Sequence, residues 1–212
     1  MSVRRGLFVT FEGGEGAGKT TLVKAISRHL EQRGLPVLLT RAPGGTPLGH
    51  TIRDLLLHGQ DLEITPQAEL YLFLADRAQH VIKMILPALE EGQIVLCDRF
   101  NDSTIAYQGC GRGLSEESVA AACLAACQGL QPDCTFYLDL PCKMGMERVK
   151  KERSGDRIEE EGLSFHEKIR EAFLRIANGN PQRVIVLDAS RPAEYVEQQA
   201  LEKLDALLAA HR

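Results

Sequence analysis

Short apolar runs alternate with longer amphipathic segments along the chain. Runs rich in β-branched and aromatic residues predict strands at Leu7–Glu12, Pro36–Arg41, Gln93–Asp98, Thr135–Leu140 and Arg183–Asp188. Apolar positions at helical spacing predict helices at Lys19–Arg33, Leu48–His58, Pro66–Leu89, Glu116–Cys127, Lys143–Lys151, Ser164–Ala177 and Ala193–Ala210. This alternation predicts an α/β fold, a parallel five-stranded sheet covered by helices on both faces.

A glycine-rich segment joins the first predicted strand to the first predicted helix. It reads Gly13-Gly14-Glu15-Gly16-Ala17-Gly18-Lys19-Thr20, followed by Thr21, and fits the phosphate-binding (P-loop) pattern of nucleoside triphosphatases. Backbone N–H groups and a helix N-terminus can surround phosphate oxygens in such a loop. Lys19 would reach the β- and γ-phosphates of ATP, and Thr20 would hold Mg²⁺. The alternative, a flexible loop that happens to precede Lys-Thr, is disfavoured by the flanking strand and helix.

Polar residues follow several of the predicted strands. In a parallel sheet, ligands bind at the edge formed by the carboxyl ends of the strands, which is where these residues would lie. Arg41, Asp98, Arg99 and the loop after Leu140 occupy these positions. Asp98 ends an apolar strand, as the second magnesium contact of a P-loop fold does, although an aspartate there could also cap the next helix. Arg99 could bond two phosphate oxygens with its planar guanidinium.

Length and charge narrow the function classes. The 212 residues suit one α/β domain. The net charge of -4 argues against a protein that functions mainly by binding nucleic acid. No segment approaches the length of a membrane span, and no leader is evident, so we expect a cytoplasmic protein. The six cysteines lack paired metal spacing, and we expect most of them to be buried small hydrophobic residues.

A P-loop alone does not separate switches, motors and kinases. The Asn-Lys-x-Asp and Asp-x-x-Gly strings that a guanine-nucleotide switch requires are absent from the sequence. A small chain with arginines after several strands and a charged, arginine-containing segment late in the sequence favours a kinase that binds two phosphate-bearing substrates.

Four motifs together resemble the bacterial thymidylate kinase family, and the resemblance covers essentially the whole chain. They are Phe11 to Thr21, Arg41-Ala42-Pro43-Gly44-Gly45-Thr46, Phe73-Leu74-Ala75-Asp76-Arg77, and Asp98 to Gly109, of which the last is specific to the family. The resemblance implies transfer of the ATP γ-phosphoryl group to dTMP with Mg²⁺, in a single domain over residues 1–212 with a short helical lid at about 150–160. It also implies a homodimer whose partners are small molecules rather than nucleic acid or membrane.

The resemblance also implies roles for individual residues. Phe73 would stack on thymine, Arg77, Thr104 and Gln108 would bond the base, and Tyr107 would crowd the sugar 2′ position. Arg53 and Arg99 would hold the acceptor phosphate, and Glu15 would accept from the sugar 3′-hydroxyl or organise magnesium. By periodicity alone, Phe73 is a core residue and Arg77 a solvated one.

The resemblance also implies a catalytic arginine. The phosphate loop has no arginine at Gly14, Gly16 or Ala17, so the resemblance points to the family branch that delivers a catalytic arginine from the lid. Arg153 is the candidate and Arg157 the substitute, while a basic, solvated helix end is the plain alternative.

The chain departs from this branch at Ala42, where the family usually has Glu. The rival functions are another nucleoside or nucleoside monophosphate kinase and a non-catalytic nucleotide switch.

Overall fold

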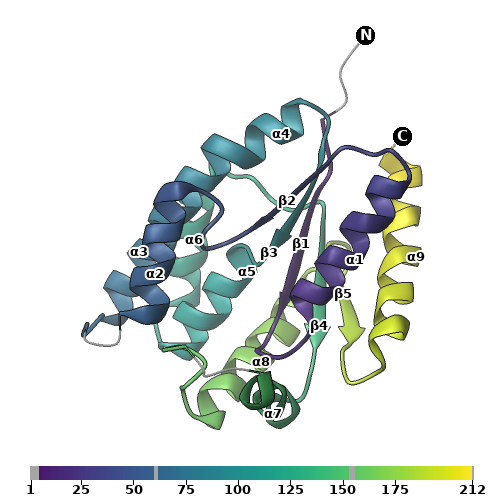
Figure 1. Ribbon diagram of the computed structural model, residues 1–212. Helices are drawn as coiled ribbons and strands as arrows, with labels where there is room; N and C mark the ends of the chain where they lie inside the picture. Colours follow the sequence, from purple (N-terminus) through teal and green to yellow (C-terminus); the bar gives the residue numbers. More distant parts are fainter. Residues whose placement is uncertain (1–4, 60–61, 153–155, 212) are drawn as a thin grey trace.

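A parallel sheet forms the centre of the molecule (Figure 1), a computed structural model that describes residues 5–59, 62–152 and 156–211. Its strands run in the order β2-β3-β1-β4-β5. They are β1 (Phe8–Gly13), β2 (Val37–Arg41), β3 (Ile94–Asp98), β4 (Cys134–Asp139) and β5 (Val184–Asp188). The predicted five-stranded sheet is confirmed, and each predicted strand end lies within about one residue of the observed end.

The predicted helices are also present, and they cover both faces of the sheet (Figure 1). The helical segments are α1 (Lys19–Gln32), α2 (Pro47–His58), α3 (Pro66–His80), η1 (Val81–Ile85), α4 (Leu86–Glu90), α5 (Asn101–Thr104), η2 (Ile105–Gly111), α6 (Glu116–Ala126), α7 (Cys142–Glu152), α8 (Leu163–Gly179) and α9 (Ala193–His211). The segments η1 and η2 are π-helical. No described helix is both long enough and apolar enough to cross a membrane.

Local sequence explains where two helices begin. The Thr46 hydroxyl accepts a hydrogen bond from the Gly49 N–H at 3.0 Å, and Pro47 opens α2. Thr65 caps α3 in the same way and is followed by Pro66. A threonine cap with proline in the first turn satisfies a free N–H and sets the helical φ in advance.

Alternate residues of β1 point to opposite faces of the sheet and pack in two separate parts of the hydrophobic core. Val9 and Phe11 pack with apolar residues of α1 and α9. Phe8 lies on the other face, with its ring centroid 4.9 Å from that of Phe100. The two-residue period places Glu12 on the same face as Phe8, and its side chain is fully buried. This carboxylate therefore lies inside the fold, one position before the phosphate loop.

The order of the strands determines where a ligand-binding crevice can form. β1 pairs with β3 on one side and β4 on the other, all parallel, so the ends of β1 and β3 lie side by side. The register pairs Phe11 with Asp98. Since α1 and α5 leave this edge from neighbouring strands, a crevice for a ligand is expected between their first turns.

Candidate active site

The phosphate loop lies between β1 and α1, and Lys19 closes it. Gly16 and Gly18 have φ of 66° and 89°, which side chains other than glycine rarely adopt. The Lys19 ammonium donates to the backbone oxygens of Gly13 at 3.0 Å and Gly14 at 2.8 Å. Burial and the neighbouring Arg99 lower the pKa of Lys19, although nearby carboxylates oppose them. The loop thus presents a buried cation in the position expected for phosphate binding.

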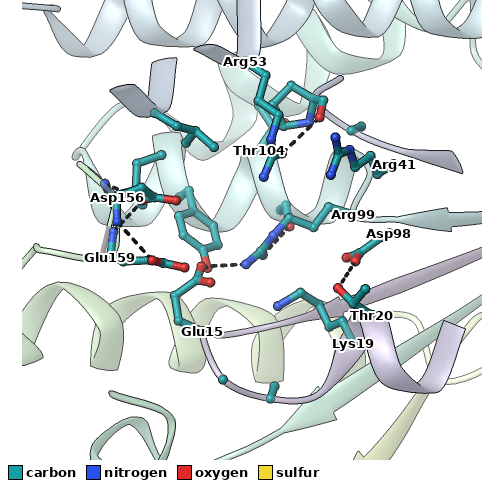
Figure 2. A pocket seen from close by; sticks show the side chains of 18 of the residues that line it. Glu15, Lys19, Thr20, Arg41, Arg53, Asp98, Arg99, Thr104, Asp156 and Glu159 are labelled. Carbon is teal, nitrogen blue, oxygen red and sulfur yellow. Dashed lines mark hydrogen bonds and ion pairs between the residues drawn. The ribbon is translucent and has the colours of Figure 1, made fainter. Parts of the chain in front are cut away.

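Thr20 and Asp98 meet beside the loop. The Thr20 hydroxyl donates to a carboxylate oxygen of Asp98 at 2.8 Å (Figure 2). Helix α5 begins after Phe100 with no side-chain cap, so the alternative that Asp98 caps this helix is wrong. Two hard oxygen donors at one point suit Mg²⁺, which keeps several of its own waters.

Arg99 is held from several sides. Its φ of 70° lies in the left-handed region. Its guanidinium donates to the Gly13 oxygen at 3.0 Å, the Ser103 hydroxyl at 3.1 Å and a Glu15 carboxylate oxygen at 2.6 Å. Glu12 stabilises the backbone that follows Arg99. Its side chain accepts a hydrogen bond from the Phe100 N–H at 2.7 Å and another from the Ser103 hydroxyl. The direction of Arg99 is therefore fixed before any ligand enters.

Glu15 is the acidic partner inside the phosphate loop. Besides Arg99, it accepts from the Tyr107 hydroxyl at 2.7 Å. Burial alone would raise the pKa of Glu15, but Arg99, Lys19 and the Tyr107 hydrogen bond outweigh it and lower the pKa to about 2. Glu15 is therefore a carboxylate throughout the neutral range, and any group that it contacts must donate a hydrogen bond or bring a positive charge.

A cavity of about 370 Å³ joins these groups (Figure 2). Lys19, Arg53 and Arg99 extend into the same space. Arg53 donates to the Pro43 oxygen at 3.1 Å, and burial together with the charges of Arg41 and Arg99 lowers its pKa. Burial is the larger cause of the lowered pKa, and repulsion from the two neighbouring arginines adds to it, so an anion bound in this part of the cavity would relieve that repulsion.

Most of the residues expected in the site line this cavity. They are Glu15, Gly16, Ala17, Gly18, Lys19, Thr20, Thr21, Arg53, Phe73, Asp98, Arg99, Thr104, Tyr107 and Gln108. Gly13 and Gly14 do not line it, although both accept from Lys19. Arg41 and Ala42, the latter at the position where the family usually has Glu, also line it.

Arg77 lies differently from the rest. It is 2% exposed and does not line the cavity, and its guanidinium carbon sits 4.2 Å from the centre of the Phe100 ring. Its Nη1 has no hydrogen-bond partner among the described residues. The expectation from periodicity that Arg77 is solvated is wrong. Phe73 is half-buried and lines the cavity, beside apolar neighbours.

Helix α7, which leads into the segment expected to form the lid, touches the phosphate loop through backbone. A Cβ placed on Gly145 would lie 2.2 Å from the Glu15 backbone oxygen, and one placed on Gly16 would lie 2.4 Å from the Gly145 oxygen. Arg148 donates from Nη1 to the Gly16 oxygen at 3.2 Å. At Gly145 and Gly16, α7 therefore rests on the phosphate loop backbone against backbone.

Two arginines were expected to act from a lid. Arg153 falls outside the described residues. Arg157 donates from Nε to the Leu56 oxygen at 2.9 Å and pairs through Nη2 with Glu69 of α3. In this arrangement Arg157 ties the segment after α7 to α2 and α3.

Two buried acids, Glu12 and Glu69, belong to this site and were not among the predicted residues. Glu69 is 1% exposed and accepts from Gln108, Arg112 and Arg157. In the sequence it stands in the first turn of a predicted helix, where acids are common because they favour the helix dipole. Glu12 could have been found from the sequence. It is an acid at the end of an apolar predicted strand, and a carboxylate buried there must have hydrogen-bond partners.

Comparison with known proteins agrees with this geometry. The family model described as thymidylate kinase matches residues 11–200. The chain belongs to the thymidylate kinase family. A thymidylate kinase of Desulfovibrio desulfuricans is 48% identical over 209 residues, covering 95% of this chain and 96% of that protein. One from Synechococcus is 50% identical over 189 residues, covering 89% of each.

A solved structure shows the same fold. The crystal structure of thymidylate kinase from Ehrlichia chaffeensis superposes with a TM-score of 0.77 at 34% identity, covering 95% of this chain and 99% of that one. The expected family and fold are therefore confirmed, and the chain is an enzyme of the thymidylate kinase family.

Proposed function

We propose that this chain transfers the γ-phosphoryl group of ATP to dTMP, giving dTDP and ADP for dTTP synthesis. Membership of the thymidylate kinase family supports the reaction. The observation that carries the proposal is one cavity that joins the phosphate loop to an arginine cluster and then to Phe73 and Gln108. Such a cavity can hold a triphosphate, a second phosphate and a base in line.

The donor side of the cavity follows from the phosphate loop. The loop N–H groups and Lys19 would hold the β- and γ-phosphates of ATP, and Thr20 with Asp98 would hold Mg²⁺. When bound, the magnesium ion neutralises charge on the transferring group. Glu15 is close enough to Lys19 to influence its pKa, so the loop also carries one negative charge near the bound nucleotide.

The acceptor side follows from the arginines and the base pocket. Arg53 and Arg99 would hold the 5′-phosphate of dTMP, one oxygen of which attacks the γ-phosphorus while the bond to the bridging oxygen of ADP breaks. Thymine would lie against Phe73, within reach of Thr104 and Gln108.

Two further acceptor contacts concern the sugar and the base. Tyr107 would exclude a 2′-hydroxyl, and Glu15 would accept from the 3′-hydroxyl or help to organise magnesium. The base would also take a hydrogen bond from Arg77, whose Nη1 has no partner among the described residues, although a small rearrangement is needed because Arg77 does not line the cavity here.

We further propose that Arg153 stabilises the transferring group, which would place the chain in the lid-arginine branch of the family. The absence of arginine from the phosphate loop supports this role, as does the pairing of Arg157 with Glu69. An arginine that meets the equatorial oxygens mainly in the transition state raises kcat rather than affinity.

The remaining features belong to the same proposal. A cytoplasmic enzyme of one domain, acting on small molecules rather than on nucleic acid or membrane, agrees with the charge and composition. We also propose a homodimer, since α2 and α3 expose the large apolar side chains Leu48, Leu55 and Tyr71. Light scattering coupled to gel filtration tests the dimer, and a monomer at micromolar concentration contradicts it.

A coupled ADP-release assay with dTMP, dUMP, CMP, AMP and thymidine as acceptors tests the reaction. The expected result is fast turnover with dTMP that depends on magnesium and is abolished in Lys19→Ala. Faster turnover with CMP or AMP would leave a kinase of another specificity, and ATP turnover that ignores every acceptor would leave a nucleotide switch.

A further inference from the structure

Gln108, the candidate base reader, is held at one end by a buried carboxylate. Its Nε2 donates to Glu69 Oε1 at 2.8 Å, and both side chains are 1% exposed. This is the only side-chain hydrogen bond that Gln108 makes within the described residues. Gln108 also lines the cavity. Its carbonyl oxygen and second amide hydrogen therefore remain for a ligand.

A carboxylate accepts hydrogen bonds and does not donate them when ionised. Only the amide nitrogen of Gln108 can face Glu69, because a flipped amide would set its oxygen against a carboxylate oxygen. Burial alone would raise the pKa of Glu69, but hydrogen bonds from Arg112, Gln108 and Arg157 lower it. Glu69 therefore stays ionised, and the amide orientation of Gln108 is fixed by chemistry as well as by packing.

The fixed orientation matters because thymine and uracil present the opposite hydrogen-bonding pattern to cytosine. Thymine and uracil offer an N3–H donor beside an O4 acceptor, which matches the oxygen and the N–H of the amide as Glu69 holds it. Cytosine offers an N3 acceptor beside an amino donor, which matches the flipped amide. A site whose polar groups cannot turn rejects the base that leaves them mispaired.

We propose that Glu69 is a positioning residue that sets the preference for thymine over cytosine by fixing the amide orientation of Gln108. The inference rests on the proposed function of the site and deepens it. Arg112 and Arg157 hold the carboxylate in turn: Arg112 Nε lies 3.1 Å from Oε1, and Arg157 pairs with Oε2. Because Arg157 lies within the segment expected to form the lid, base selection and the position of this segment share one carboxylate.

The test compares acceptor ratios in the full-length chain. Glu69→Gln keeps the shape but can turn either end of its own amide to Gln108, so the orientation is no longer dictated. We expect the ratio of kcat/KM for dTMP to that for dCMP to fall about tenfold or more. The dTMP to dUMP ratio should stay unchanged, because these two bases present the same polar edge. Ratios measured on one preparation do not depend on its active fraction.

Glu161→Gln is the matched control, since it removes the other carboxylate partner of Arg112 and leaves Glu69 and Gln108 in place. Its two ratios should equal those of the wild type. An unchanged dTMP to dCMP ratio in Glu69→Gln overturns the proposal, as does an equal fall in Glu161→Gln or a matching fall in the dTMP to dUMP ratio.

If Glu69→Gln does not fold, Gln108→Leu tests the same proposal. It must lose the same dTMP to dCMP discrimination, and adding Glu69→Gln to it must change the ratio no further. Retained discrimination in Gln108→Leu overturns the proposal. Wild-type turnover with dTMP decides the proposed function separately from all of these results.

Discussion

Gly145→Ala tests whether α7 must rest on the phosphate loop. The added Cβ would lie 2.2 Å from the Glu15 backbone oxygen, whereas real Cβ contacts below 3.0 Å are essentially absent from proteins. Neither atom belongs to a flexible side chain, so α7 and the loop must separate by about 0.8 Å in a close-packed interior. A displacement near 1 Å at reacting groups costs about 100-fold in rate, and we expect a loss of that order in kcat.

Helix propensity works in the opposite direction, which makes the result informative. Alanine is favoured over glycine inside a helix by about 1 kcal/mol, so the variant need not be less stable. Gly179→Ala is the control, because Gly179 ends α8 and a Cβ there meets nothing within 4 Å. Both variants are measured by coupled ADP release at saturating ATP and dTMP, with thermal melting alongside. Wild-type kcat in a folded Gly145→Ala protein refutes the argument that this contact positions the loop.

Three further predictions concern single side chains. Lys19→Ala should abolish transfer in a folded protein, because it removes the cation proposed to bridge the β- and γ-phosphates, and retained turnover contradicts this role. Arg153→Ala should lower kcat strongly with dTMP affinity nearly intact, whereas Arg99→Ala should lose both; steady-state kinetics with equilibrium dTMP binding distinguishes them. Burial and then Asp102 raise the pKa of Glu12 from 4.5 to about 7, so the free energy of unfolding should fall by up to about 3 kcal/mol between pH 5 and 8. Denaturant titration of Glu12→Gln should lose this slope, and an unchanged slope contradicts the assignment.

The direction of the pH effect follows from the neutral form being favoured in the fold. The folded pKa of Glu12 lies above its ordinary value, so the folded protein holds its proton to higher pH than the unfolded chain does. Stability is therefore greatest below about pH 5 for this group and declines as the pH rises through 7.

Sequence reasoning worked where function depends on local order along the chain. The phosphate loop needs only a strand, glycines and a helix in succession, and Asp98 was found because strand ends share one edge of a parallel sheet. The same logic singled out Arg41, which lines the cavity, although no role was assigned to it.

It failed where a role depends on partners distant in the sequence. Glu69 meets residues 39, 43 and 88 positions away, and within its own helix it resembles an ordinary first-turn acid. The helical stretch from Asn101 to Gly111 was also not predicted as an element, since its π-helical part and glycines break the usual periodicity. It packs on α6 and α8, so tertiary contacts rather than local pattern stabilise it.

The cluster of Lys19, Arg41, Arg53 and Arg99 carries a consequence for binding kinetics. The chain as a whole has a net charge of -4, and the cavity lining sets these four cations against the four acids Glu15, Asp98, Asp156 and Glu159, so its formal charges balance while the arginines gather in one part of it. Arg41 and Arg99 lie close enough to Arg53 to lower its pKa, and a concave site with low-dielectric walls focuses the local field of these three arginines on an anion that enters. Added salt should therefore slow capture more than release, because screening weakens attraction at a distance more than contact in a partly buried site. The enzyme would then be sensitive to ionic strength mainly when its substrates are scarce.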